Sequence, residues 1–150
     1  MKTTLSALAL FGVLFACGGG DSGGGGNAVV ITANDAMQFN KRAFQVTLGD
    51  TVSITLKNVG SMPVETMGHN LVILKPGSDR NKFGLAGAEA KDNGYIPPKY
   101  QDWVVLKTGL LGPGQEETIE FTPTEAGEYP YLCTFPGHVA TMKGTIIVGK

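Results

Sequence analysis

The sequence is poor in cysteine and histidine, and this shortage limits how the chain can be stabilised. Its 150 residues include two cysteines and two histidines. Cys17 follows an apolar leader, whereas Cys133 lies close to the end of the chain, so we do not expect the two to pair. A scaffold held together by disulfides is therefore excluded, and a lone thiol in an exported protein needs another reason to be present.

Charge of either sign is also scarce. The formal net charge is −1, and 17% of the residues are charged. A nucleic-acid-binding protein would need a basic face, which this balance does not provide. By contrast, 42% of the residues are hydrophobic, enough for one domain with a sizeable core.

Residues 1–16 have the pattern of an export signal. Lys2 provides a positive start, and Leu5 to Phe15 form an apolar stretch too short to span a membrane. The stretch ends Leu-Phe-Ala-Cys, similar to bacterial lipoprotein signals, which predicts cleavage before Cys17 and lipid on its thiol. The alternative is an ordinary signal peptide with a chance cysteine. Both alternatives predict an exported, periplasmic or extracytoplasmic protein. The lipoprotein signal also predicts that lipid anchors it to a membrane.

Residues 17–27 follow the leader and are rich in glycine. Such a segment has little to bury, so we expect a flexible tether between Cys17 and a folded domain. The remaining residues, 28–150, are predicted to form that domain.

The domain has the pattern of an all-β protein. Short strands separated by turn residues predict a β-sandwich of about eight strands. Residues 51–57 alternate, with Val52, Ile54 and Leu56 on one side, as in a half-buried antiparallel strand. Residues 70–74 are predicted to be a central strand, and residues 75–101 an excursion from one edge of the sandwich. A short helix is expected there over residues 82–91, its apolar side formed by Phe83, Leu85, Ala86 and Ala90.

The loop before the last predicted strand concentrates metal-binding side chains. Cys133, His138 and Met142 offer a thiolate, an imidazole and a thioether, which suit copper better than a hard cation. Pro136 and Gly137 exclude a regular helix and indicate a tight loop. Taken alone, a methionine such as Met142 more often fills the core, and only its position after Cys133 and His138 favours a ligand.

His69 is the one other histidine of the sequence. If it joins the loop, the set of two histidines, one cysteine and one methionine is that of a blue-copper electron-transfer site. Gly68 has no side chain and allows its carbonyl to approach the metal. Asn70 is expected to brace the site by hydrogen-bonding to the Cys133 loop or its sulfur.

Three other functions compete with electron transfer. Copper oxidases and nitrite reductases add histidine clusters, which two histidines do not allow, so we expect no enzyme. A copper-delivery protein is the main alternative, although a closed four-ligand site argues against it. Zinc also binds cysteine and histidine, and a spectrum would distinguish it from copper.

The motifs identify a family resemblance. Cys133-Thr134-Phe135-Pro136-Gly137-His138, with the spacing Cys-x4-His-x3-Met, resembles the ligand loop of azurins, a branch of the cupredoxins. Met67-Gly68-His69-Asn70 resembles the segment that carries their first histidine, and the likeness covers roughly residues 29–148. The chain lacks the cysteines of the azurin disulfide, and its leader is similar to those of membrane-tethered auracyanin-like relatives.

The resemblance implies a Greek-key β-sandwich with one type 1 copper. Its ligands would be His69, Cys133, His138 and Met142, with the Gly68 carbonyl as a weak fifth contact and Asn70 and Phe135 beside them. The expected partners are redox proteins such as c-type cytochromes or a respiratory oxidase, which would dock on an apolar patch near His138. We expect a monomer that binds no nucleic acid. The residues proposed for the patch are Met37, Met67, Leu110, Pro136 and Val139.

Overall fold

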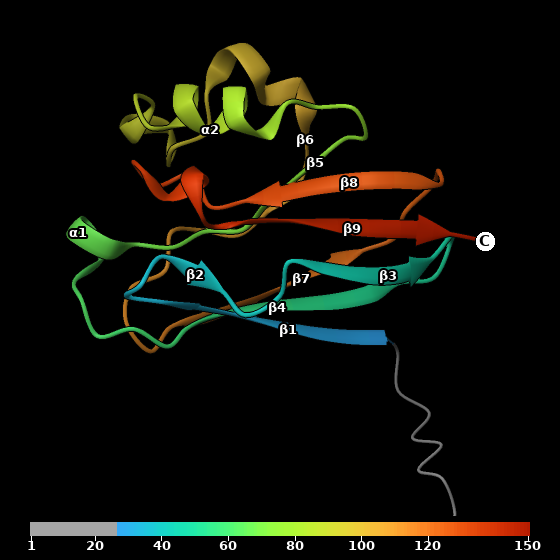
Figure 1. The fold of residues 1–150 in the computed structure, drawn as a ribbon, viewed down its shortest axis with the longest axis horizontal. Helices are drawn as coiled ribbons and strands as arrows, with labels where there is room; N and C mark the ends of the chain where they lie inside the picture. The colour runs from blue at the N-terminus through green and yellow to red at the C-terminus, as the bar shows by residue number, and fades with distance from the viewer. Residues whose placement is uncertain (1–26) are drawn as a thin grey trace, which may run out of the picture.

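The computed structural model describes residues 27–150, which form two β-sheets packed face to face (Figure 1). The predicted leader, the lipid site at Cys17 and nearly all of the predicted tether lie outside the described residues. Within the described part, helices are too short or too polar to cross a bilayer.

The sandwich consists of a four-stranded and a five-stranded sheet. The first has the order β2-β1-β4-β7 and the second β3-β9-β8-β5-β6. The first sheet comprises β1 (Asn27–Asn34), β2 (Gln38–Phe39), β4 (Val52–Asn58) and β7 (Glu116–Phe121). The second comprises β3 (Ala43–Thr47), β5 (Val72–Leu74), β6 (Val104–Lys107), β8 (Gly127–Leu132) and β9 (Lys143–Gly149).

Two pairs of strands run parallel although they are distant in the chain. β1 pairs with β4, and β3 pairs with β9, while the other strand pairs are antiparallel. The chain therefore crosses repeatedly between the two sheets, as in Greek-key sandwiches. The predicted all-β sandwich is confirmed.

The core lies between the sheets and follows the alternation of the sequence. Val52, Ile54 and Leu56 of β4 are fully buried, while Thr51 before them is exposed, as the pattern predicts. Ile31 and Ala33 of the neighbouring strand β1 contribute to the same cluster. Burial of one face of each strand thus fixes the register of the four-stranded sheet.

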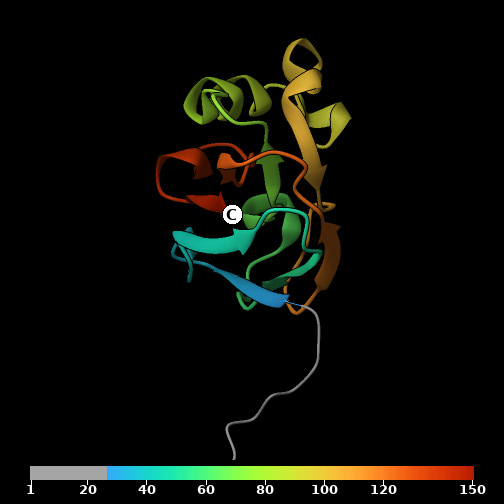
Figure 2. The same cartoon turned by 90° about the vertical axis from the view of Figure 1, so that its right-hand side faces the viewer.

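Unlike β4, strand β5 is apolar at every position, because both of its faces are buried. Ile73 belongs to the core between the sheets, whereas Val72 and Leu74 belong to a second cluster on the outer face. That face is covered by the excursion between β5 and β6, which lies over the five-stranded sheet in both views (Figure 1, Figure 2). A strand covered on both faces needs no polar alternation. The excursion comprises α2 (Arg80–Gly87) and two 3₁₀ segments, η1 (Lys91–Asn93) and η2 (Pro98–Trp103).

The helix of the excursion begins and ends earlier than predicted. Asp79 caps α2 by accepting hydrogen bonds from two backbone N–H groups of its first turn, which sets the start of the helix. The prediction that Leu85 lies on the buried side is wrong, because this side chain is 69% exposed. Phe83 is buried as predicted, and the other buried residues of the helix are Gly84 and Gly87. The two small glycines let the helix approach the sheet closely, and they leave no apolar signal in the sequence.

The structure also contains short elements that the sequence did not predict. Nine strands are described rather than about eight, the additional one being the two-residue β2. A single helical turn, α1 (Val64–Met67), precedes the His69 segment. The predicted strand over residues 70–74 is shorter, because Asn70 and Leu71 lie before β5. These elements are too short for a periodic pattern to reveal them.

Candidate metal centre

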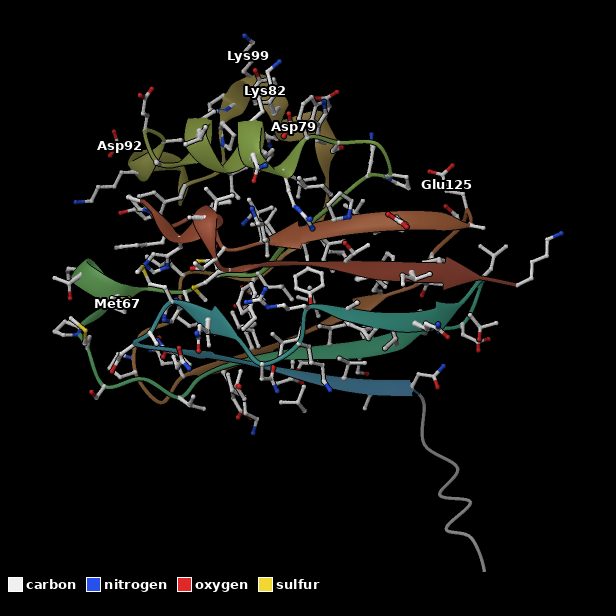
Figure 3. The ribbon with its side chains drawn as sticks, viewed as in Figure 1. Met67, Asp79, Lys82, Asp92, Lys99 and Glu125 are labelled. Atoms are coloured by element: carbon white, nitrogen blue, oxygen red, sulfur yellow. The ribbon has the colours of Figure 1, made fainter. Side chains whose placement is uncertain are left out.

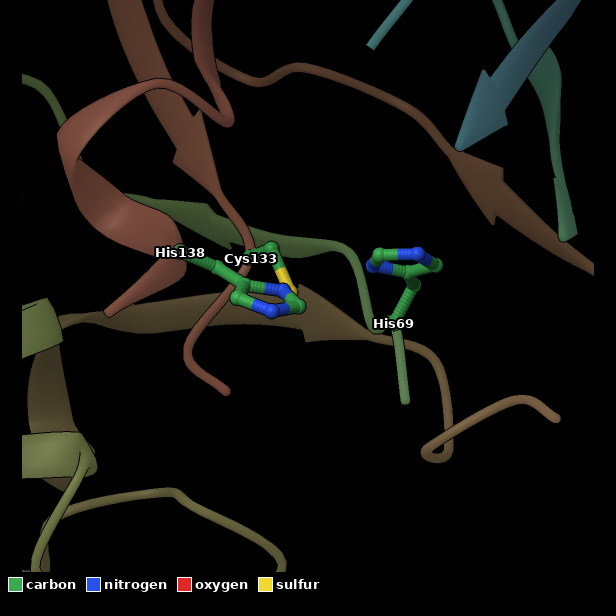
Figure 4. Close-up of side chains that lie close together, drawn as sticks. All are labelled: His69, Cys133 and His138. Carbon is green, nitrogen blue, oxygen red and sulfur yellow. The ribbon is translucent and has the colours of Figure 1, made fainter. Parts of the chain in front are cut away.

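Three side chains from two distant parts of the chain meet at one end of the sandwich. One ligand atom from each of His69, Cys133 and His138 lies within 4.8 Å of the other two (Figure 4). The Cys133 Sγ and His138 Nδ1 atoms are 3.4 Å apart. Cys133 and His69 are fully buried, and His138 is 2% exposed. Three of the four side-chain ligands predicted from the sequence thus lie together.

The loop that carries Cys133 and His138 is closed by its own backbone. Cys133 follows β8, and its N–H donates to the carbonyl of Met142 (3.0 Å). The N–H of Met142 donates in turn to the carbonyl of His138 (2.8 Å), next to the 3₁₀ turn η3 (His138–Ala140). Gly137 enters this turn with φ 83°, which favours glycine. The loop therefore holds its side chains with little freedom, and Met142 is fully buried within it.

His69 is held by a bridge to a different segment. Its N–H donates to the Leu111 carbonyl (3.1 Å), and the Leu111 N–H donates to the His69 carbonyl (2.8 Å). Before it, a Cβ on Gly68 would lie 2.7 Å from the Val64 carbonyl oxygen and 2.8 Å from Leu110 Cγ. Glycine is thus required here for packing, whether or not its carbonyl also faces a metal.

Asn70 joins the His69 segment to the Cys133 loop. Its Nδ2 donates to Thr134 Oγ1 (2.8 Å), and the Thr134 N–H donates to its Oδ1 (2.8 Å). The two residues are buried, so both bonds form away from water. Sequence reasoning proposed Asn70 as a brace but missed Thr134. A threonine directly after a candidate ligand cysteine was the available signal.

The side chain of His69 has an unusual environment. Both of its ring nitrogens are buried, and among the described residues neither has a hydrogen-bond partner. Buried polar groups are normally paired, because leaving one unpaired costs free energy. A metal ion bonded to one nitrogen would remove that cost for that atom. The cluster therefore fits a bound metal, and its soft donor set fits copper.

Burial controls the protonation of the three groups in the metal-free protein. It lowers the pKa of His69, although the nearby Asn34 backbone opposes that shift, and it lowers the pKa of His138 to about 4, assisted by the nearby His69. Burial raises the pKa of the Cys133 thiol to about 11, although hydrogen bonds from the Asn70 and Phe135 backbone oppose that shift. At neutral pH both imidazoles are consequently uncharged and available as donors, while the thiol keeps its proton until a metal displaces it.

The remaining predicted site residues lie around this cluster. The Phe135 ring lies 4.8 Å from the His138 ring, centre to centre. Met37 and Pro136 are exposed, as the proposed docking patch requires, and Leu110 is half-buried. The assignment of Val139 to that patch is wrong, because this side chain is 8% exposed and belongs to the cluster under the excursion. The loop turns it inward toward α2.

Comparisons with known proteins agree with this geometry. The family described as "Copper binding proteins, plastocyanin/azurin family" matches residues 27–149. Azurin from Alcaligenes faecalis is 34% identical over 126 residues, covering 81% of this chain and 98% of the relative. Outer membrane protein H.8 from Neisseria meningitidis serogroup B (strain ATCC BAA-335 / MC58) is 40% identical over 122 residues, covering 79% of this chain. The chain spans 66% of the length of that second relative.

Solved structures give the same result. Reduced auracyanin from the photosynthetic bacterium Roseiflexus castenholzii superposes with a TM-score of 0.72 at 32% identity, covering 85% of this chain and 100% of that one. An azurin (Az-iso2) from the methylotroph Methylomonas sp. strain J superposes with a TM-score of 0.71 at 27% identity. The match covers 83% of this chain and 98% of that one.

Proposed function

Because the chain belongs to the plastocyanin/azurin family of copper-binding proteins, we propose that it is a type 1 (blue) copper protein that carries single electrons between redox partners. The observation that carries the proposal is the buried cluster of His69, Cys133 and His138, whose ligand atoms lie within 4.8 Å of one another. The unpartnered nitrogens of His69 support it further.

The proposed ligands are His69, Cys133, His138 and Met142, with the Gly68 carbonyl as a weak fifth contact. Copper supplies a one-electron exchange between its two oxidation states. The chain contributes rigidity, since the loop is closed on itself and Asn70 ties it to the His69 segment. A rigid donor set favours electron transfer because neither oxidation state needs the ligands to rearrange.

Burial of the donors favours an electron carrier over an enzyme or a delivery protein. With His69, Cys133 and His138 at most 2% exposed, a substrate has little room to reach a metal among them. A delivery protein would benefit from ligands that a second protein can reach. Electrons do not need such access, because a partner need only come close to the His138 edge.

Electron exchange requires a surface where partners dock. We propose the patch formed by Met37, Met67, Leu110 and Pro136. Of these, Met67 is labelled in Figure 3, at the end of the sandwich that carries the ligand loop. Met37 is 37% exposed, and Met67 and Leu110 are half-buried. Apolar contacts of this kind suit brief encounters with c-type cytochromes or a respiratory oxidase. The chain is proposed to act as a monomer and to bind no nucleic acid.

We also propose that the protein is exported and anchored to a membrane. The sequence of residues 1–17 favours export and lipid attachment at Cys17, and residues 17–27 would join the lipid to the domain of residues 28–150. The name of the relative "Outer membrane protein H.8" agrees with a membrane location. Expression of the full chain with Cys17→Ser tests this directly. Membrane-bound wild type and soluble variant are expected, and equal membrane binding of both would reject the anchor.

The copper assignment is tested by spectroscopy of the purified domain. With Cu(II), the wild type should be intensely blue and should bleach reversibly on reduction. Cys133→Ala should abolish the colour, because the thiolate bond to copper is its source. A blue Cys133→Ala variant would overturn the ligand assignment. Blue protein that loses copper rapidly to a chelator and exchanges no electrons with a purified c-type cytochrome would favour copper delivery.

A further inference from the structure

The excursion between β5 and β6 touches the ligand loop through a face made of glycines. A Cβ on Gly84 would lie 2.6 Å from Val139 Cβ, and one on Gly87 would lie 3.3 Å from Thr134 Cβ. Gly84 and Gly87 are three residues apart and therefore share one face of α2. Thr134 follows Cys133 and Val139 follows His138, so this helix face contacts the neighbours of two proposed ligands.

Tyr95 brings a second part of the excursion to the same loop. Its φ is 64°, a left-handed conformation that tyrosine rarely adopts. The N–H of Tyr95 donates to the Ala90 carbonyl (2.9 Å), and its own carbonyl oxygen would be 2.7 Å from a Cβ on Gly87. The hydrogen bond to Ala90 therefore closes this turn, and the close approach to Gly87 places it against the end of α2.

The ring of Tyr95 leads directly to the cluster. It lies 5.2 Å from the Phe135 ring, and the Phe135 ring lies 4.8 Å from the His138 ring. The His138 and His69 rings are 5.0 Å apart. Tyr95 is itself 7% exposed, so the contact with Phe135 is sheltered from water. A continuous series of rings thus connects the excursion to both proposed histidine ligands.

The conformation of Tyr95 indicates that its ring matters more than local backbone preference. Glycine or asparagine would adopt a left-handed turn at lower cost. Among the described residues, Met37 is the other non-glycine residue with positive φ, and its carbonyl accepts a hydrogen bond from Thr141 Oγ1 (2.7 Å). Both strained residues therefore contact the ligand loop, and strain of this kind tends to gather at functional sites.

We propose that Tyr95 is a positioning residue for the metal centre: its ring supports Phe135, which sets the orientation of the His138 ring. This inference rests on the proposed copper function only for its consequences in the loaded protein. The excursion is accordingly a support that keeps the ligand loop in place, and not merely a cover for β5.

Hydrogen exchange in the metal-free protein tests the support without copper. Tyr95→Asn removes the ring and leaves a residue that tolerates the left-handed turn, so we expect it to fold. Backbone amides of residues 134–142 should exchange about three- to tenfold faster, the effect of losing one aromatic pair. Tyr95→Phe keeps the ring and should exchange like the wild type, as should the amides of β4 in both variants.

The copper-loaded protein gives a second readout. Tyr95→Asn should shift the visible absorption of the centre and release copper to a chelator about three- to tenfold faster, whereas Tyr95→Phe should match the wild type. Gly87→Ala is a less selective variant: its methyl group displaces the Tyr95 backbone while leaving the ring present, and it also presses on Thr134 of the ligand loop. It should show the same faster exchange at residues 134–142.

The outcomes separate the two proposals. If the wild type is not blue, the copper function fails, while the exchange rates of the metal-free protein still decide the role of Tyr95. If the wild type is blue but Tyr95→Asn and Gly87→Ala leave both exchange and spectrum unchanged, the role of Tyr95 is rejected. Should Tyr95→Asn not fold, Tyr95→Gly decides, because it also removes the ring and adopts the left-handed turn without strain.

Discussion

The ladder between β4 and β7 and the metal end of the sandwich follow opposite rules. In the ladder, polar side chains meet partners directly across the strands. Thr55 pairs with Thr118 (Oγ1 to Oγ1, 2.7 Å), and Lys57 with Glu116 (Nζ to Oε2, 2.6 Å). At the metal end, His69 has two buried ring nitrogens without partners, and Cys133 keeps a free thiol in the core.

The difference shows which part of the molecule is built for stability and which for chemistry. The ladder agrees with local rules at every level: alternation, cross-strand pairing and burial. The metal end departs from them with buried unpaired donors and with left-handed backbone conformations at Met37 and Tyr95. Such departures persist where another requirement outweighs them, here the binding of a metal ion.

The largest effect should come from the core of the ladder strand. Leu56→Ala is expected to lower the free energy of unfolding by about 2–5 kcal/mol, since a fully buried side chain leaves a cavity. Guanidinium unfolding of the copper-free protein measures this. The blue spectrum of the folded variant should be unchanged. Loss of the spectrum at full folding would show that the two regions are not separable.

At the metal end, a comparable substitution should have the opposite sign. His69→Leu replaces two unpartnered nitrogens with an apolar group of similar size, so the copper-free protein should gain up to about 1–3 kcal/mol. The same unfolding experiment measures it, and added copper should no longer stabilise this variant. A clear loss of stability in the copper-free state would mean that the imidazole has a stabilising partner.

The next effect is the release of protons when copper binds. The pKa of Cys133 is raised to about 11 and that of His138 is lowered to about 4, so near neutral pH copper binding should release one proton, from the thiol. Copper affinity should therefore rise about tenfold, or about 1.4 kcal/mol, per pH unit between roughly pH 5 and 10.

Titration of the weakly buffered protein with Cu(II) measures the released protons. Below about pH 4, His138 also binds a proton, and release should rise above one per copper. Release near zero at pH 7 would show that Cys133 is already a thiolate in the metal-free protein.

The smallest effect should come from the charged pair of the ladder. The side chains of Lys57 and Glu116 are 42% and 57% exposed, so water and salt weaken their attraction. A double-mutant cycle with Lys57→Ala and Glu116→Ala should give about 0.2–1 kcal/mol at low salt, decreasing as salt is added. A larger coupling would indicate that the ladder depends on charge as well as on burial.

The strand pattern and the candidate metal-binding groups can be predicted without the structure. Alternation in β4 reflects a local period that burial imposes, and it can be read without knowing the neighbouring strands. His69, Cys133 and His138 could be selected because the chain contains so few residues of these types. Because so few candidates exist, these residues could be chosen without knowing where they lie in the folded chain.

How these groups are supported depends on contacts between segments that are distant in the chain. The Asn70–Thr134 pair joins residues 64 positions apart, and the Tyr95–Phe135 contact joins two loops of no regular period. The burial of Val139 and the exposure of Leu85 were mispredicted for the same reason. α2 packs on the ligand loop through glycines, and glycines give no apolar signal in the sequence. Local patterns record which face of a segment is buried, but not which distant segment covers it. The folded chain alone determines that choice, because it arises from packing between segments remote in sequence.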